Sequence, residues 1–316
     1  MPDRRLRTHP PEGVEIQARA LTKRYGGTLA VDGLSFTARP GVVTGFLGPN
    51  GAGKSTTLRM LFGLSRPTGG TVTIGGRRLA DLDDPARTIG ALLDARAVHP
   101  HRTAADHLLT FAHAAGLART RVGEVLDLVG LSGAATRPAG EFSLGMQQRL
   151  GIATALLGDP GVLVLDEPLN GLDPEGIRWM RTLMRDLAAQ GRTILFSSHL
   201  MSELELTADD VIVVGRGRLI AETTLERFVE ENTTRTVTVR TSTPDALARA
   251  LRASGVDFAA RPDSSFAVTG TDASTVGKIA AAEGIALDEL VRARESLEDV
   301  FLRLTHDATE YGSHAA

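Results

Sequence analysis

The stretch from Gly48 to Ser55 constrains this chain more than any other part of it. It reads Gly-Pro-Asn-Gly-Ala-Gly-Lys-Ser and fits the spacing G-x-x-x-x-G-K-[ST]. Glycines let backbone N–H groups turn inward around phosphate oxygens, and the lysine places a point charge on the β- and γ-phosphates. The apolar run GVVTGFLG leads into the loop, and a helical pattern follows it. The sequence therefore predicts a strand–loop–helix unit that binds a nucleoside triphosphate.

The expected phosphate contacts come from one continuous run of residues. The Ser55 hydroxyl is expected to ligate Mg²⁺, and the start of the following helix adds its positive end to the anion site. A chance glycine-rich turn is the plainer alternative, but it needs neither a buried strand before it nor a helix after it. The loop alone does not distinguish a kinase from a GTPase or a motor protein. We assign nucleotide binding to Gly48, Pro49, Asn50, Gly51, Ala52, Gly53, Lys54, Ser55 and Thr56.

Composition indicates a soluble globular chain without thiol chemistry. The 316 residues are 42% hydrophobic and 23% charged, and the net charge of −3 gives no reason to expect a nucleic-acid partner. The absence of cysteine excludes disulfides, thiolate metal sites and a cysteine nucleophile, and it fits a reducing compartment. No secretory signal is evident, and no apolar run approaches the roughly 18 to 20 residues that cross a bilayer. We therefore expect any membrane role to come through a partner chain.

Strand and helix patterns alternate along most of the chain and predict an α/β core. Alternation of this kind favours a parallel sheet with helices on its faces. We expect a flexible tail over residues 1–13, a nucleotide-binding domain over 14–225 with a helical insert at about 103–158, and an accessory domain over 226–316. The accessory region has the pattern βαββαβ and closes on a helix in SLEDVFLRLT, which predicts a small ferredoxin-like α+β domain.

Two acidic residues follow the apolar run VLVL at 162–165. Asp166, at the tip of a buried strand, can hold Mg²⁺ directly or through water. Glu167, one residue further on, is placed to polarise a water in line with the γ-phosphate and to act as general base. Two solvated acids at the end of an ordinary strand are the alternative. In a chain that already has a phosphate loop, the hydrolytic interpretation is favoured.

The stretch GEFSLGMQQRLGIATALLGDP lies just before that acidic strand, and here the chain resembles the ATP-binding cassette (ABC) ATPases. The family signature LSGGQ appears as FSLGM, followed by Gln-Gln-Arg. Ser143 opens a helix and Gly145 lets the backbone approach an anion, so this helix start offers a hydroxyl and N–H groups to phosphate. Taken alone, Ser143 would be an ordinary helix cap. The order of phosphate loop, signature, acidic strand and late histidine favours the family.

Three further positions take their roles from this resemblance. Tyr25 corresponds to the aromatic residue that stacks on adenine, Asp173 to the loop that reaches the dimer partner, and His199 to the switch histidine that contacts the γ-phosphate. A strand-end tyrosine and a structural histidine are the plainer alternatives. The resemblance covers about residues 14–225. It implies an ATP hydrolase that forms a homodimer, with Mg-ATP held between the phosphate loop of one copy and the signature of the other.

The resemblance also implies partners and a branch of the family. ABC ATPases of this kind work on integral membrane permease subunits and sit on the cytoplasmic face of the cell membrane through them. Many members carry a glutamine where this chain has Asp94 in LLDARAVHP. That replacement, the SLGM signature and the closing SLEDVFLRLT resemble the branch that exports antibiotics and peptides. We expect Asp94 to attract Mg²⁺ or a basic residue of the coupling region.

Several alternatives stay open at the level of sequence. An importer ATPase carries the same catalytic motifs, so these motifs do not determine the direction of transport. A soluble ABC ATPase acting on ribosomes or DNA usually has two cassettes or a long coiled-coil arm, and a P-loop kinase would not need the signature helix. Four nearby histidines have spacings that match no compact metal-ligand motif. We expect solvated loop and helix positions for His99, His101, His107 and His113.

Overall fold

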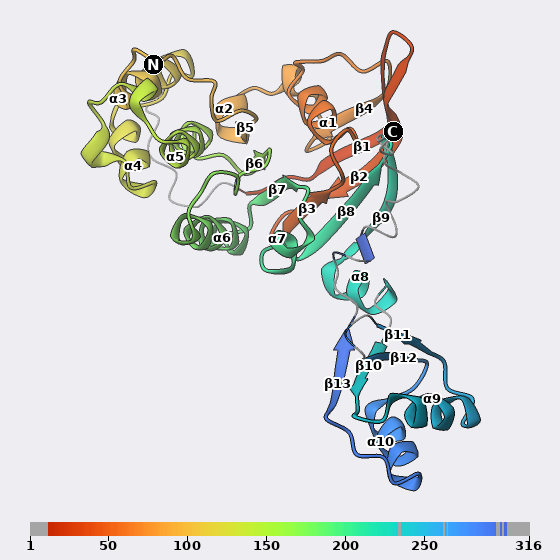
Figure 1. Ribbon diagram of the computed structural model, residues 1–316. Helices are drawn as coiled ribbons and strands as arrows, with labels where there is room; N and C mark the ends of the chain where they lie inside the picture. The colour runs from red at the N-terminus through yellow and green to blue at the C-terminus, as the bar shows by residue number, and fades with distance from the viewer. Residues whose placement is uncertain are drawn as a thin grey trace. The chain divides into compact units, whose positions relative to one another are not determined.

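The computed structural model describes residues 12–232, 235–261, 263, 265–294, 298, 300 and 301. The described chain divides into two compact units, which meet between Glu226 and Arg227 in sequence. In Figure 1 the first unit runs from the red strands to the green-cyan ones, and the second runs from cyan to blue. Nearly all of the expected N-terminal tail and most of the expected closing helix SLEDVFLRLT lie outside the described residues.

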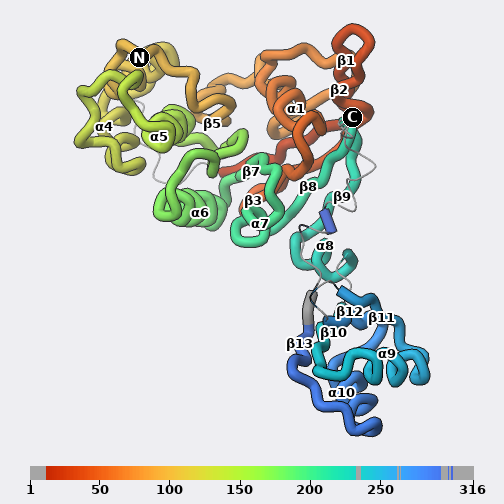
Figure 2. Tube along the Cα trace, in the orientation of Figure 1, coloured from red at the N-terminus to blue at the C-terminus, as the bar shows by residue number. Residues whose placement is uncertain are grey.

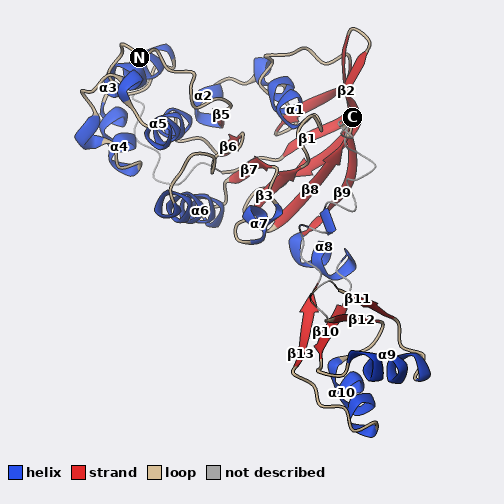
Figure 3. Ribbon diagram, in the orientation of Figure 1, coloured by secondary structure: helices blue, strands red, loops and turns tan. Residues whose placement is uncertain are grey.

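A six-stranded sheet forms the centre of the first unit, as Figure 3 shows in red. It consists of β3 (Val43–Leu47), β5 (Ile89–Leu92), β6 (Val162–Leu165), β7 (Thr193–Ser198), β8 (Asp210–Gly215) and β9 (Arg218–Thr224). The spatial order is β5-β6-β7-β3-β8-β9. All neighbours run parallel except β9, which pairs antiparallel with β8 at the edge. Strands β3 and β6 are buried at every position, as their apolar runs predict.

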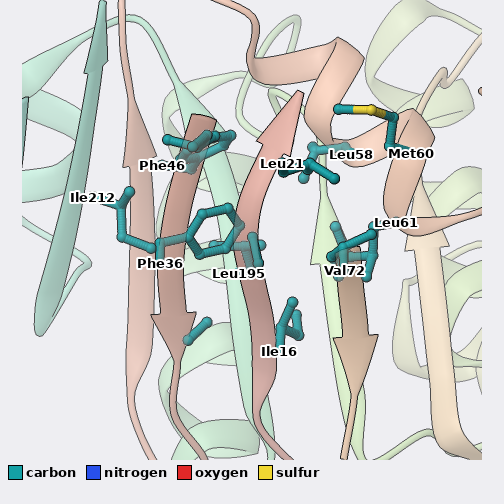
Figure 4. Packing of buried hydrophobic residues seen from close by; sticks show 14 of the residues in the cluster. Ile16, Leu21, Phe36, Phe46, Leu58, Met60, Leu61, Val72, Leu195 and Ile212 are labelled. Atoms are coloured by element: carbon teal, nitrogen blue, oxygen red, sulfur yellow. The ribbon is translucent and has the colours of Figure 1, made fainter. Parts of the chain in front are cut away.

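A second, three-stranded sheet of this unit is antiparallel. Its strands are β1 (Ile16–Tyr25), β2 (Thr28–Ala38) and β4 (Gly69–Ile74), in the order β2-β1-β4. The alternation of strands and helices predicts one parallel sheet, so this layer is a difference between the expectation and the structure. Figure 4 shows Ile16 and Phe36 from this layer packed with Phe46 and Leu195 from the parallel sheet. The two layers therefore share one hydrophobic core.

Helices follow the strands of the parallel sheet and build the expected insert. Those attached to the sheet are α1 (Lys54–Leu61), α2 (Pro85–Thr88), α6 (Pro174–Ala189) and α7 (Met201–Glu205). The insert contains α3 (Ala104–Ala114), α4 (Thr120–Leu128) and α5 (Leu144–Leu156), which lie together in Figure 2. Short 3-10 turns are η1 (Leu79–Asp81), η2 (Ser132–Ala134) and η3 (Ala139–Glu141). No helix in the described part of the chain combines the length and apolarity needed to cross a bilayer.

The second unit is a small α+β domain that begins within α8 (Leu225–Asn232). It contains β10 (Arg235–Arg240), α9 (Pro244–Ala253), β11 (Phe258–Ala260), β12 (Phe266–Thr269), α10 (Ala273–Ala282) and β13 (Glu289–Arg294). The strands form one antiparallel sheet ordered β11-β12-β10-β13, and both helices share its hydrophobic core.

The last strand of this unit begins later than the sequence predicts. The apolar pattern IALDELV suggests a strand from Ile285, but β13 starts at Glu289. The Ile285 N–H bonds the Ala280 carbonyl oxygen and closes α10, so this residue completes the helix end before the strand begins.

Candidate nucleotide-hydrolysis site

The glycine-rich loop lies between the end of β3 and the first turn of α1. Gly53 caps α1 with φ +97°, and a Cβ at this position would stand 2.5 Å from the Ala30 carbonyl oxygen. Only glycine meets both the left-handed backbone and the close approach without strain. Ser55 and Thr56 follow in the first turn of α1. The loop is thereby placed against the positive end of the helix, where anions bind well.

Lys54 is almost buried inside this loop, with 7% of its side chain exposed. Its Nζ donates to the carbonyl oxygens of Gly48 at 2.5 Å and Pro49 at 3.3 Å, and lies 3.9 Å from Glu167 Oε1. Burial lowers the pKa of Lys54, while the negative charges of Glu167 and Asp166 raise it. The ammonium group therefore lies beside Glu167, one of the two acids that the sequence pairs with the loop.

Ser197 of β7 organises the two acidic residues that follow β6. Its hydroxyl donates to Asp166 Oδ1 at 2.5 Å and accepts from the Glu167 N–H at 2.9 Å. No motif marks Ser197 in the sequence. The parallel pairing of Leu165 with Phe196 brings the next residue of each strand together, and that pairing is the only signal that could have found it.

The backbone of Glu167 is strained and is bonded on both sides. Its φ of +50° lies in the left-handed region, which is costly for a residue with a Cβ. The Gln148 side-chain amide donates to the Glu167 carbonyl oxygen at 3.2 Å, opposite the bond from the N–H to Ser197. Strain of this kind persists only where the surroundings hold it, and it gathers at functional sites.

The Glu167 carboxylate is surrounded by polar groups from three elements. His199 Nδ1 lies 2.9 Å from Oε2, and Asn170 Nδ2 donates to the same oxygen at 3.4 Å. The other oxygen, Oε1, faces Lys54. The structure thus brings together the phosphate loop, the acidic strand end and the late histidine.

The signature residues begin α5, away from these contacts. The Ser143 hydroxyl accepts from the Met146 N–H at 3.3 Å, and Asp173 caps α6 in the same manner by accepting from the Gly176 N–H at 2.8 Å. A Cβ on Gly145 would lie 3.2 Å from the carbonyl oxygen of Gly171, so α5 packs closely on the loop before Asp173. In a single chain, ordinary helix capping accounts for the side-chain hydrogen bonds of Ser143 and Asp173.

Tyr25 and Asp94 lie outside the contacts that join the acidic centre. Tyr25 ends β1 with 49% of its surface exposed, and its hydroxyl bonds Ser65 Oγ at 3.0 Å. Asp94 follows β5, is exposed, and its Oδ1 accepts from the Arg96 N–H at 2.9 Å. The tyrosine ring is thus half exposed, with Lys23 Nζ lying over it 4.7 Å from its centroid, and Asp94 caps its own loop. Over the described residues, no group of three or more His, Cys, Asp or Glu side chains is placed to hold a metal ion.

The four histidines of the insert are not uniformly solvated. His99, His101 and His113 are exposed, as expected. His107 is buried with 4% exposure and packs its ring against Phe111, so the expectation of a solvated position is wrong there. It lies on the inward face of α3, and burial lowers its pKa.

Comparison with known proteins adds the family. Residues 31–170 match the ABC transporter family, and residues 235–298 match a domain of unknown function, DUF8746. The chain is 35% identical over 311 residues to the uncharacterized ABC transporter ATP-binding protein YhcH of Bacillus subtilis, covering 95% of this chain and 99% of that protein. This chain belongs to the ABC transporter ATP-binding proteins. Its resemblance to the ABC ATPases and its α/β phosphate-loop core, both predicted from sequence, are confirmed, and the chain is an ATP hydrolase.

Other relatives are similar over about two thirds of the chain. The bacitracin transport ATP-binding protein BcrA of Bacillus licheniformis is 42% identical over 220 residues, 69% of this chain and 72% of that protein. The Nod factor export ATP-binding protein I of Burkholderia orbicola is 41% identical over 220 residues, 68% of this chain and 72% of that protein. A solved ATP-binding subunit of an ABC transporter superposes with a TM-score of 0.63 at 29% identity, covering 68% of this chain and 92% of that one. This ABC transporter ATP-binding protein is thus similar to subunits of transporters named for transport or export.

Proposed function

We propose that this ATP-binding protein powers export through a separate pair of membrane permease subunits. It acts as a homodimer on the cytoplasmic face of the cell membrane, where ATP binding closes the dimer and hydrolysis opens it. The observation that carries the proposal is the Glu167 carboxylate, held on a strained backbone between Lys54 of the phosphate loop and His199. In this ABC ATPase a base so placed couples bound ATP to a conformational cycle.

The oxygen donors beside the loop fit the Mg²⁺ ion that accompanies ATP. The Ser55 hydroxyl and the Asp166 carboxylate would hold it, and Ser197 already orients Asp166. Bound Mg²⁺ neutralises the charge that develops on the β- and γ-phosphates. We also propose that Asp94, which is exposed just after β5, contacts the metal or the coupling region.

The protein's own groups then divide the work of hydrolysis. Lys54 binds the β- and γ-phosphates with a charge-assisted hydrogen bond. Glu167 takes a proton from the attacking water on a carboxylate oxygen, which a base within hydrogen-bonding reach can do. His199 orients that carboxylate through Oε2 and contacts the γ-phosphate. Tyr25 stacks on the adenine ring.

The signature residues complete the site from the partner copy. Ser143, Gly145 and Asp173 are proposed to reach the nucleotide of the other chain, with the start of α5 offering its N–H groups to the γ-phosphate. In capping α5, the Ser143 oxygen acts as an acceptor, so its O–H hydrogen stays available to donate to a phosphate oxygen of the partner's nucleotide. The site is therefore composite, and one chain alone holds only half of it.

The cargo class rests on the relatives. One is named for bacitracin transport and another for Nod factor export, so we propose an antibiotic, peptide, drug or lipid-like cargo that leaves the cell. We also propose that residues 14–225 are the ATP-binding domain and 226–316 an accessory domain. The strand order β11-β12-β10-β13 in a βαββαβ chain supports a ferredoxin-like fold for the accessory domain.

The permease partner gives the direct test. The membrane fraction of cells that express a tagged chain is isolated and extracted in mild detergent, and the chain is purified together with its partners. A polytopic membrane protein that raises the ATPase rate is the expected companion. A chain recovered with ribosomes or DNA instead would favour the soluble alternative, and uptake rather than loss of cargo in membrane vesicles would favour an importer.

A further inference from the structure

Gln148, in the second turn of α5, connects the signature helix to the acidic centre of its own chain. Its side chain is buried with 4% exposure, and its amide donates to the Glu167 carbonyl oxygen at 3.2 Å across 19 residues of sequence. The start of the same helix, at Ser143 and Gly145, is the part proposed to meet the nucleotide of the partner copy. The contact of Gln148 therefore lies between two sites of different chains.

The two polar residues beside Gln148 in the helix are anchored elsewhere. The Gln147 amide donates to the Phe142 carbonyl oxygen at 3.4 Å, just before its own helix begins. The Arg149 guanidinium donates to the Val129 carbonyl oxygen of the insert at 3.0 Å. Of these three residues, Gln148 is the one that bonds the acidic centre, so the contact is particular to its position on the helix.

The Glu167 backbone needs support from outside its own strand. Its φ of +50° is costly for a residue with a Cβ, and Pro168 restricts the residue before it and has no N–H to donate. The Ser197 hydroxyl accepts from the Glu167 N–H at 2.9 Å, and the Asn170 N–H donates to the carbonyl oxygen at 3.3 Å. Gln148 adds the bond that comes from another helix. The orientation of this backbone decides where the carboxylate points.

Helix α5 is a firm support because it packs on the sheet without a gap. A Cβ on Gly151 would stand 2.5 Å from Leu92 Cδ1 of β5, and a Cβ on Gly90 would collide with the Ala155 carbonyl oxygen of α5. Strand β5 pairs in turn with β6, where Leu92 lies opposite Leu165. Closely packed interiors have low compressibility, so the Gln148 amide keeps a fixed place relative to the end of β6.

We propose that Gln148 is a positioning residue for hydrolysis, which holds the Glu167 backbone and thereby aims the carboxylate at the attacking water. The inference rests on the proposed role of Glu167 as general base. Helix α5 then serves both nucleotides of the dimer, the partner's through its first turn and its own chain's through Gln148. A general base acts only within hydrogen-bonding reach of the proton it takes. Loss of this support should therefore slow the chemical step and leave ATP binding nearly unchanged.

Steady-state ATP hydrolysis by the full chain tests this role. Gln148→Met and Gln148→Leu remove the donor with two side-chain shapes that both favour a helix. In each variant kcat should fall about tenfold, as expected for one lost hydrogen bond in the reacting complex, while KM for ATP stays within about twofold. Thr154→Val is the matched control, because it removes the 3.0 Å bond from the Thr154 hydroxyl to the Leu150 carbonyl oxygen within the same helix and should keep the wild-type kcat.

The Glu167→Gln background separates positioning from a general effect on the protein. Once the base is gone, its orientation no longer matters, so adding Gln148→Met should lower the residual rate by less than about twofold. A further tenfold loss would overturn the proposal, since Gln148 would then act independently of Glu167. Wild-type turnover in Glu167→Gln alone would instead contradict the assignment of the base in the proposed function, so the two failures are distinguishable.

Mixed dimers show on which chain Gln148 acts. A Lys54→Ala chain paired with a Ser143→Arg chain keeps one site, formed by the loop of the second chain and the signature of the first. Gln148→Met should lower turnover about tenfold when the Ser143→Arg chain carries it, because that chain supplies Glu167 to the intact site, and by less than about twofold when the Lys54→Ala chain carries it. The reverse pattern would overturn the proposal. So would a wild-type kcat in both single variants of Gln148, or an equal loss of kcat in Thr154→Val.

Discussion

His199 Nδ1 lies 2.9 Å from Glu167 Oε2, although 32 residues separate the two in the chain. The contact joins the end of β7 to the end of β6 at one edge of a parallel sheet, where such sites form. Lys54 approaches the other carboxylate oxygen from the phosphate loop. The carboxylate is therefore fixed by charged or polar groups on both oxygens before ATP binds.

Replacing Glu167 by glutamine should separate binding from hydrolysis. An amide keeps the shape and the contact with His199 but cannot take a proton from water, so turnover should fall by roughly 10²- to 10⁴-fold. ATP affinity should stay within a few fold. The stalled variant should accumulate as a dimer with ATP, visible by size-exclusion chromatography, while phosphate release measures turnover.

The exposed Glu283 offers a matched control for this exchange. Glu283→Gln changes the same atoms on the accessory domain and should leave turnover and oligomeric state unchanged. Wild-type turnover in Glu167→Gln would remove this residue from the mechanism.

Two inactive variants should restore each other if the site is composite. Lys54→Ala removes the phosphate-binding charge of one chain, and Ser143→Arg blocks the signature of the other. A mixed dimer keeps one intact site, so random mixing should restore about a quarter of the wild-type sites. Phosphate release is measured after mixing, with Lys54→Ala mixed with itself as the control. No recovery in mixed dimers proven by a two-tag pull-down would argue that each chain holds a complete site, or that one site cannot turn over alone.

The sequence predicted the parts of the site that local patterns define. The phosphate loop, the acidic pair after VLVL and the signature each combine a short motif with one strand or helix, and the structure places them as such. Ser197 was not identified from the sequence, because its role depends on the register between β6 and β7, which no local pattern encodes. The antiparallel sheet β2-β1-β4 was not predicted for the same reason, since pairing of β1 with β4 joins residues far apart in the chain. Burial of His107 depends on which side of α3 packs inward. The prediction treated His107 like the nearby histidines and did not consider which side of the helix it occupies.

Asp94 should matter for coupling more than for hydrolysis. Its side chain is exposed and caps its own loop through the Arg96 N–H. In the isolated subunit, Asp94→Ala should therefore leave ATP affinity and basal turnover within a few fold, less than the tenfold that about 1.4 kcal/mol would give. In the assembled transporter the same variant should move less cargo per ATP hydrolysed.

Asp94→Asn separates the two roles of this residue. The amide oxygen can still accept from the Arg96 N–H, so the loop keeps its cap while the charge is lost. Reduced coupling in both variants would assign the effect to the charge. A lower melting temperature in Asp94→Ala with normal coupling would show a structural cap only, and a loss of basal turnover as large as that of Glu167→Gln would place Asp94 in the catalytic site.

Glu203 should set the position of His199 from behind. The Ser198 hydroxyl donates to Glu203 Oε2 at 2.5 Å and accepts from the Leu200 N–H at 3.0 Å. These bonds hold the residues directly before and after His199 in the chain. Glu203→Ala should lower kcat about tenfold with little change in KM, since a misplaced His199 affects the reacting complex more than ATP binding. Glu203→Gln should keep most of the rate, because its amide oxygen still accepts from Ser198.

The same residue makes stability depend on pH in a defined direction. Burial raises the pKa of Glu203 above its ordinary value of 4.5, and the nearby Glu167 carboxylate adds to this, while Ser198, His199 and Arg181 oppose it. The folded protein therefore holds the proton more tightly than the unfolded chain, and the free energy of unfolding falls as pH rises from the unfolded pKa through the folded one. Glutamine removes this cost, so the melting temperature of Glu203→Gln should gain on wild type as pH rises from about 4.5 to neutrality. Glu205→Gln, exposed in the same helix, should follow wild type at every pH. A parallel course for Glu203→Gln and wild type would show that this carboxyl ionises as freely in the folded protein as in the unfolded chain.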